Sequence, residues 1–264
     1  MCPSLKELQN SLLEMYQSFY DVMEQEGLDV FLVGGSALGA IRHRGFIPWD
    51  DDMDAAMLRA DFEKMERLLA ARGGRIGVYR YLPAENEIHP DAPVGHLYDM
   101  RMVEKRGYAL SPKIDIHPLD GVPGRGLMRK MQNVISKVYY LFAYNHPTKN
   151  KGKVMKMITR LILAVTPKRL RLAYVRSGKR FITRWNRADM THVCSLYGEA
   201  GYTRETLPCE MVLPARRVPF EDREFKTFAD VEGYLARRYG DYMTLPPASE
   251  RRPVHGIADV EETC

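Results

Sequence analysis

The chain has 264 residues, of which 45% are hydrophobic and 28% are charged, a composition typical of globular proteins. Its apolar runs fall far short of the roughly 20 residues that cross a bilayer, and its first residues lack the basic and apolar regions of a secretory signal. Its four cysteines lack the spacing of a zinc site or a disulfide scaffold, which favours reduced thiols. We therefore expect a cytoplasmic protein that does not span the membrane.

Positive charge is concentrated in one part of the chain. Residues 125–187 contain 17 Lys and Arg and no Asp or Glu, whereas the rest contains 22 Lys and Arg and 34 Asp and Glu. We interpret this segment as a basic, mostly helical insertion, broken at Pro147 and Pro167, in a single domain over residues 1–264. The expected parts are an N-terminal helix over 1–27, a catalytic core over 28–124, the insertion over 125–187 and a C-terminal part of the core over 188–264.

The first elements follow from apolar periodicity and glycine positions. Apolar residues recur at three- and four-residue steps from Leu5 to Val22, which predicts a helix that ends at Gly27. A short apolar strand over 28–33 precedes a short helix, with Ser36 predicted at its N-cap and Gly45 beyond its end.

The later elements alternate between strands and helices. An extended segment over 50–57 is followed by a helix over 59–72 and by strands over 96–103 and 113–117, the second ending in a turn over 118–121. A hairpin within 211–228 and a helix over 231–239 close the core. This order predicts an α+β fold with a mixed sheet.

Gly34, Gly35 and Ser36 form a candidate phosphate-binding turn. Glycine lets the backbone approach a ligand closely, and the start of the following helix offers free N–H groups and the positive end of its dipole. A glycine pair between a strand and a helix is also common as a simple turn, so this pattern alone is weak.

The run Trp49-Asp50-Asp51-Asp52-Met53-Asp54 is a candidate metal site. In an extended segment Asp50, Asp52 and Asp54 point to one face, with neighbours about 6–7 Å apart. Crowded carboxylates repel one another unless a cation neutralises them, and hard oxygen ligands favour Mg²⁺ or Mn²⁺ over zinc. A solvated acidic turn is the alternative, but the apolar neighbours on both sides favour the metal site.

A third carboxylate is expected from an adjacent strand. Asp115 lies between two isoleucines, and a buried carboxylate at such a position needs a partner. Asp99 and Asp120 are weaker candidates, and Asp120 is predicted to form a turn.

A resemblance to a known family rests on three segments: FLVGGSALGAIRHRGFIPWDDDMDAAMLRADFEK, KIDIHPLDGVP and VPFEDREFKTFADVEGYLARRYGDYMTLPP. They resemble the LicD family, which comprises bacterial phosphocholine transferases related to fukutin and fukutin-related protein in the nucleotidyltransferase-fold superfamily. The chain departs from the family pattern at His117, where phenylalanine is frequent, near Lys226-Thr227, where a proline is expected, and at Val254-His255, where a histidine pair is expected.

The resemblance implies a nucleotidyltransferase-like core and a metal-dependent reaction. A CDP-linked donor such as CDP-choline would give a substituted phosphate to a hydroxyl of a cell-surface or lipid-linked glycan, and CMP would leave. Gly35 and Ser36 would hold the diphosphate, while Asp52, Asp54 and Asp115 would bind Mg²⁺ or Mn²⁺ and provide the catalytic groups. By the same analogy, Asp115 would accept the proton of the acceptor hydroxyl. Attack at the proximal phosphorus, which is nucleotidyl transfer, stays open.

Other assignments also stay open. Arg42 is placed either to neutralise a diphosphate or to satisfy the dipole at a helix end. His117 is either structural or close to the reacting phosphate. Tyr98, Tyr108, Trp185 and Tyr197 are available to an aromatic cage for choline, with none preferred. The basic segment suits an anionic membrane surface or, as a rival function, nucleic acid; the family resemblance favours the membrane.

Overall fold

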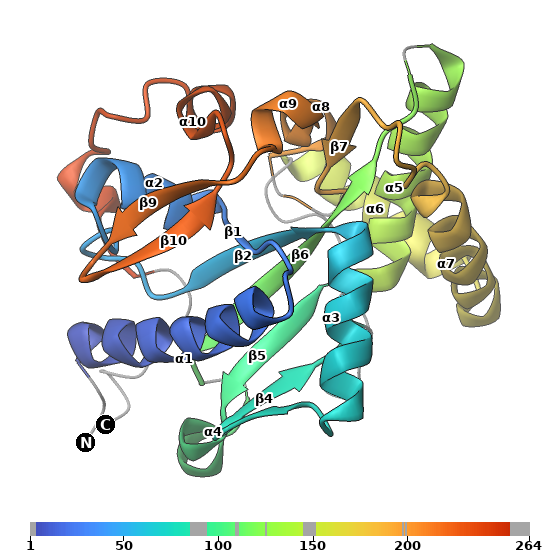
Figure 1. The fold of residues 1–264 in the computed structure, drawn as a ribbon. Helices are drawn as coiled ribbons and strands as arrows, with labels where there is room; N and C mark the ends of the chain where they lie inside the picture. Colours follow the sequence, from blue (N-terminus) through green and yellow to red (C-terminus); the bar gives the residue numbers. More distant parts are fainter. Residues whose placement is uncertain are drawn as a thin grey trace.

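The computed structural model describes residues 4–84, 94–108, 111–124, 126–144, 152–196, 198 and 200–253. These residues combine helices with an eight-stranded mixed sheet and a separate two-stranded hairpin (Figure 1). The α+β class expected from the sequence is confirmed. None of the described helices is both long enough and apolar enough to cross a membrane.

The centre of the sheet is the parallel pair β2 and β6, and every other pairing in it is antiparallel. The strand order is β1-β2-β6-β5-β4-β3, and β7 and β8 extend the sheet from the far end of β6. The strands are β1 (Phe31–Leu32), β2 (Met53–Leu58), β3 (Arg75–Ile76), β4 (Tyr79–Leu82), β5 (Gly95–Asp99), β6 (Lys113–Gly121), β7 (His192–Cys194) and β8 (Thr206–Pro208).

Two helices cover one side of this sheet. The helix α1 (Leu5–Gln25) begins at a capping box formed by Ser4 and Glu7 and buries the apolar face that its periodicity predicts. The helix α3 (Arg59–Ala71) packs beside it on β2 and β6, and Figure 1 shows both in front of the strands. The helix predicted to end at Gly27 is thus present and ends two residues earlier.

The start of helix α2 (Gly34–His43) differs from the prediction. Its N-cap is Val33, so Ser36 lies inside the helix, where its Oγ accepts a hydrogen bond from the backbone N–H of Asp54 at 2.9 Å. Its C-cap is Arg44, whose backbone is left-handed with φ of 58°, one residue before the predicted Gly45. The strand expected over 28–33 shortens to β1.

The strand β6 continues through the predicted turn at residues 118–121. Asp120 is fully buried in it, and its two oxygens accept hydrogen bonds from Nε and Nη2 of Arg59, both at 2.7 Å. The expectation that Asp120 forms a turn is therefore wrong, because a buried ion pair with α3 stabilises an extended backbone there. The strand expected over 96–103 ends at Asp99, whose side chain caps the helix α4 (Met100–Arg106).

The C-terminal elements match the prediction more closely. The hairpin consists of β9 (Arg216–Phe220) and β10 (Arg223–Thr227), and the helix α10 (Val231–Tyr239) has the predicted bounds. Asp230 caps α10 by accepting a hydrogen bond from the N–H of Gly233. This part of the chain also contains the short helices α8 (Tyr202–Glu205) and α9 (Cys209–Val212) and the 3₁₀ turn η2 (Ala248–Glu250).

The basic segment is helical, as expected, and forms α5 (Leu127–Tyr144), α6 (Gly152–Val165) and α7 (Lys168–Thr183) at one end of the molecule (Figure 1). Helices α5 and α7 share an apolar cluster with the core, to which they contribute Tyr139, Ala143 and Ile182. In α6 only Thr159 is buried. Pro167 is the N-cap of α7, and Pro147 lies outside the described residues. The proposed division into four parts stays a prediction.

Candidate functional site

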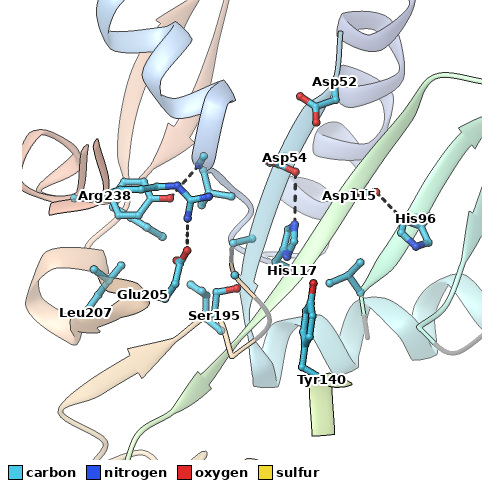
Figure 2. Close-up of a pocket in the computed structure, with 18 of the residues that line it drawn as sticks. Asp52, Asp54, His96, Asp115, His117, Tyr140, Ser195, Glu205, Leu207 and Arg238 are labelled. Atoms are coloured by element: carbon cyan, nitrogen blue, oxygen red, sulfur yellow. Dashed lines mark hydrogen bonds and ion pairs between the residues drawn. The ribbon is translucent and has the colours of Figure 1, made fainter. Parts of the chain in front are cut away.

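A pocket of about 380 Å³ opens beside the central strands of the sheet. Its wall combines acidic and basic side chains from β2, β5, β6, α8 and α10 with Tyr140 of α5 (Figure 2). It is also lined by apolar residues, which lower the local dielectric and so strengthen the interactions among these charges. Ionisable groups that converge in a partly apolar pocket are typical of an active site.

Strand register places two of the predicted carboxylates side by side. In the parallel pairing of β2 with β6, Asp54 lies opposite Asp115, and in the antiparallel pairing of β5 with β6, His96 lies opposite Asp115. Asp54, Asp115 and His117 each offer a ligand atom, and these atoms lie within 4.8 Å of one another. This arrangement has the size and the donor chemistry of a divalent cation site.

Asp52 lies just before β2 and lines the same pocket (Figure 2). Its pKa is raised to about 9, first by burial and then by the negative charges of Asp54, Asp50 and Asp115. The three closest ligand atoms belong to Asp54, Asp115 and His117. Asp52 is not among them but lines the same pocket. A bound cation would relieve the crowding of negative charge that the raised pKa records.

Asp115 has the opposite electrostatic environment. Burial opposes its ionisation, but Lys113 and then His96 and His117 outweigh burial and hold the pKa of this carboxyl below its usual range. Lys113 Nζ contacts both carboxylate oxygens, and His96 Nδ1 lies 2.7 Å from Oδ1. Neither Lys113 nor His96 was predicted from the sequence. The i, i+2 spacing of Lys113 and Asp115, which puts them on one face of a strand, could have indicated Lys113.

His117 lies in the pocket wall, with its Nε2 3.5 Å from Asp54 Oδ1 (Figure 2). Burial lowers its pKa, but the hydrogen bond and the charge of Asp54 and the charge of Asp115 outweigh burial, and the pKa is raised. Its Nδ1 is buried without a hydrogen bond to any described residue. The position favours a role in the site over the purely structural alternative.

The glycine turn contacts the carboxylates directly. Gly34 has φ of +56°, and a Cβ at this residue would lie 2.8 Å from Asp54 Oδ2. A Cβ at Gly35 would lie 2.9 Å from Asp50 Oδ2, and Ser36 Oγ accepts the N–H of Asp54. Of the three residues of the turn, the pocket lining includes Gly34, so Gly35 and Ser36 act in this structure by positioning the acidic segment.

Arg42 is outside the pocket lining. Its Nη1 donates to the carbonyl oxygen of Tyr242 at 2.8 Å, and its Nε lies 3.0 Å from His43 Nε2. It occupies the last turn of α2, roughly 12 Å along the helix from Gly34. This hydrogen bond to a backbone carbonyl fits a structural role for Arg42 at the end of α2 better than a contact with the diphosphate.

Arg238 of α10 supplies the guanidinium of the pocket (Figure 2). It forms an ion pair with Glu205, whose side chain is only 5% exposed, and its Nε donates to Tyr239 Oη at 3.1 Å. Nη2 has no hydrogen bond to a described residue. Arg238 was not predicted from the sequence because about 200 residues separate it from the glycine turn, and only the family resemblance of the C-terminal segment could have indicated it.

The same helix closes the pocket over the glycine turn. Tyr234 Oη accepts a hydrogen bond from the N–H of Gly34 at 3.0 Å. Tyr140, Phe228 and Tyr234 are the aromatic side chains among the lining residues. Of the tyrosines and the tryptophan considered for a choline cage, Tyr98, Tyr108 and Trp185 are outside the lining, and Tyr197 lies outside the described residues.

Comparison with known proteins identifies related sequences. The family described as LicD/FKTN/FKRP, nucleotidyltransferase domain, matches residues 27–146. The lipopolysaccharide cholinephosphotransferase LicD of Haemophilus influenzae is 26% identical over 265 residues, which cover 96% of each chain. The ribitol 5-phosphate transferase FKRP of Homo sapiens is 38% identical over 66 residues, which cover 25% of this chain and 13% of that protein. The region that the family matches, residues 27–146, contains the glycine turn, the acidic run and β6.

Proposed function

Because residues 27–146 belong to the LicD/FKTN/FKRP family of nucleotidyltransferase domains, we propose that this transferase moves phosphocholine, or a similar substituted phosphate, to a hydroxyl of a glycan. The donor would be CDP-linked, such as CDP-choline, and the acceptor a cell-surface or lipid-linked glycan at the inner face of the membrane. The observation that carries this proposal is a single pocket that contains both Asp54 with Asp115 and Arg238. Carboxylates that hold a cation and a guanidinium that binds phosphate are recurrent parts of phosphoryl-transfer sites.

We propose Mg²⁺ or Mn²⁺ as the cofactor, held by Asp54 and Asp115 with Asp52 or His117 as a further ligand. The closeness of the ligand atoms and the raised pKa of Asp52 support this fit. A divalent cation bound there would neutralise charge on the diphosphate of the donor. Both proposed ions accept the carboxylate oxygens that the pocket offers, and Mn²⁺ also accepts the imidazole nitrogen of His117.

The chain supplies further contacts for the donor. The positive φ of Gly34 and its missing Cβ let the diphosphate approach the backbone at the start of α2. Arg238 would bind a phosphate oxygen through Nη2, while Glu205 and Tyr239 keep its guanidinium in position. Lys113 contacts Asp115 in this structure. When Asp115 binds the cation, Lys113 would be released to bind a second phosphate oxygen.

In the proposed reaction the acceptor oxygen forms a bond to the distal phosphorus as the bond from that phosphorus to the bridging oxygen breaks. CMP leaves with the bridging oxygen, and the proton of the acceptor passes to a carboxylate of the pocket. Asp115 is the proposed proton acceptor. The groups that lower its pKa keep this carboxyl ionised, which is the form that accepts a proton.

The test is incubation with CDP-choline, CDP-ribitol and CDP-glycerol in Mg²⁺ or Mn²⁺, with release of CMP measured and phosphorus NMR of the products. We expect CMP from at least one donor, none after removal of metal by EDTA, and a phosphodiester on the acceptor. Asp115→Asn should lose about a hundredfold or more in turnover.

The matched control is Asp222→Asn, a side chain 79% exposed in the β9–β10 turn, which should keep wild-type turnover. CMP esterified to the acceptor, with phosphocholine released, would show attack at the proximal phosphorus instead. Equal turnover in Asp115→Asn and wild type would exclude Asp115 as the proton acceptor.

A further inference from the structure

The helix α6 presents an apolar stripe to solvent. Val154, Ile158, Leu161 and Val165 lie at i, i+4, i+7 and i+11, which is one face of a helix, and they are 67%, 44%, 62% and 68% exposed. Met157, beside this face, is 67% exposed. Large apolar side chains gathered on one exposed face mark an interaction surface more often than scattered single ones do.

A basic row runs along another face of the same helix. Lys153, Lys156 and Arg160 follow one another at i, i+3 and i+7, roughly 110–170° around α6 from the centre of the stripe and on the far side of Met157. The helix contains no acidic residue, and neither does any other part of residues 125–187. An apolar stripe on one face with lysine and arginine on another is the pattern of a helix that lies in the interface of an anionic bilayer.

We propose that α6 is a docking helix that lies in the surface of a membrane rich in anionic lipid, with its apolar stripe in the acyl boundary and its basic row on the headgroups. The helix has 14 residues, so it is roughly 21 Å long and shorter than the hydrocarbon core of about 30 Å, and it therefore lies on the bilayer.

Charge distinguishes this occupant from two others. A second copy of the chain docked through α6 would bring two basic rows together without any acidic partner in the segment, and like charges at an interface disfavour association. Nucleic acid would satisfy the basic row but would leave the apolar stripe in water. An anionic bilayer satisfies both faces of the helix.

The adjoining helices connect this surface to the pocket. On α5, Leu127, Met131 and Val134 lie at i, i+4 and i+7 and are 68%, 37% and 60% exposed, and Tyr140 of the same helix lines the pocket. Docking through this end of the molecule would hold the pocket near the bilayer, where a lipid-carried acceptor is concentrated. The proposal of a lipid-carried acceptor rests on the proposed function, but the docking surface itself does not.

The test is co-sedimentation of the full chain with vesicles of phosphatidylcholine containing increasing phosphatidylglycerol. Binding should rise with the anionic fraction and fall with salt, because the attraction is screened over about 10 Å at 0.1 M. The variant Ile158→Gln with Leu161→Gln removes apolar surface without changing charge. It should bind vesicles at least roughly tenfold more weakly than wild type does. Changing Lys153, Lys156 and Arg160 to Gln should weaken binding on the order of a hundredfold at low salt.

Two matched controls lie elsewhere on the surface. Val78→Gln with Met243→Gln changes side chains that are 47% and 56% exposed, and Arg67, Arg75 and Arg80 changed to Gln removes three exposed charges. Both controls should bind vesicles as wild type does. A Leu161→Trp reporter should shift its fluorescence to shorter wavelength on anionic vesicles, and circular dichroism verifies that each variant is folded.

Equal vesicle binding by the α6 variants and wild type would overturn the proposal. So would binding of RNA without vesicle binding, or a concentration-dependent dimer that the α6 variants abolish while vesicle binding is absent. CMP release is measured separately without vesicles. If wild type binds anionic vesicles and the α6 variants bind them more weakly, but none of these proteins releases CMP, the proposed chemistry fails and the docking surface stands. If wild type releases CMP but does not bind vesicles, the docking surface fails and the proposed chemistry stands.

Discussion

At the residue scale, the site is defined by carboxylates with opposite environments. Asp52 is buried among other acids and has a raised pKa, whereas Asp115 is held ionised by Lys113 and His96. The alternation of acidic and apolar residues indicated that Asp52 and Asp54 share a face, and Asp115, between two isoleucines, was expected as a third carboxylate from an adjacent strand. All three line one pocket in the structure. The sequence pattern could not predict Arg238 or His96, because their approach depends on strand order and on contacts distant in sequence.

Substitutions of the pocket carboxylates should affect Mn²⁺ binding and the stability of the metal-free protein differently. Asp54→Asn and Asp115→Asn are expected to lose Mn²⁺ binding in titration calorimetry, because each removes one member of the closest ligand group. Asp52→Asn is expected to stabilise the metal-free protein by about 1–3 kcal/mol, because it removes a buried acid surrounded by like charges. Asp222→Asn should change neither property. Normal Mn²⁺ binding by both Asp54→Asn and Asp115→Asn would exclude the proposed site.

Glu66 of α3 should make stability depend on pH. Burial raises the pKa of its carboxyl, and Tyr81, whose hydroxyl lies 3.3 Å from it, only partly offsets burial. A carboxyl with a raised folded-state pKa contributes stability below its unfolded value of 4.5 and loses it as the pH rises through the folded value.

We therefore expect Glu66→Gln to be more stable than wild type at pH 8, by up to about 1.4 kcal/mol for each unit of pKa shift. The difference should vanish near pH 4 in urea unfolding measured across this range. Glu63→Gln, an exposed change on the same helix, is the control and should show no such trend. A constant difference at all pH values would contradict the assignment to Glu66.

At the element scale, long periodic segments were predicted well and short or irregular ones were not. The helices α1, α3 and α10 and the β9–β10 hairpin follow from periodicity, caps and turn residues. The last part of β6 was missed because Pro118 and Gly121 are turn residues by propensity, yet Arg59 buries Asp120 in an extended strand. Tertiary contacts overrode local preference there. The strands β3 and β4 carry two and four residues, which is too few for a periodic signal.

The turn between β1 and α2 should tolerate no side chain at Gly34. Gly34→Ala would force alanine into positive φ and place its Cβ 2.8 Å from Asp54 Oδ2. We expect a loss of about 1–2 kcal/mol in stability from the backbone and, in addition, a loss of turnover and of Mn²⁺ binding from displacement of the carboxylate.

Gly73 provides the matched control for this turn. It has φ of +65°, and a Cβ there would meet nothing within 4 Å. Gly73→Ala should therefore show the same backbone cost in thermal unfolding with normal turnover. If both variants lost turnover equally, backbone strain alone would explain the effect and the contact with Asp54 would be irrelevant.

At the scale of the whole molecule, the basic segment divides into an integrated part and a peripheral part. Gln132 of α5 is fully buried, and its Nε2 donates to the carbonyl oxygens of Gly121 and Ile182 at 3.0 and 2.7 Å. Tyr202 Oη donates to its Oε1 at 2.6 Å, so one side chain joins α5 to β6, α7 and α8. Charge composition marked residues 125–187 as one unit, but composition does not report which helices bury side chains against the core.

This division predicts that α6 is dispensable for folding, whereas α5 and α7 are required. Replacing residues 147–166 with a flexible linker of roughly ten glycine and serine residues should leave the thermal unfolding midpoint within about 4 °C of wild type, since only Thr159 of α6 is buried. Replacing residues 127–183 in the same way should prevent cooperative unfolding, because it removes Gln132 and the shared apolar cluster. The first protein should also turn over a soluble acceptor at the wild-type rate. A loss of cooperative unfolding in the first protein would show that α6 stabilises the core, and its exposed stripe would then need an explanation within the folded chain.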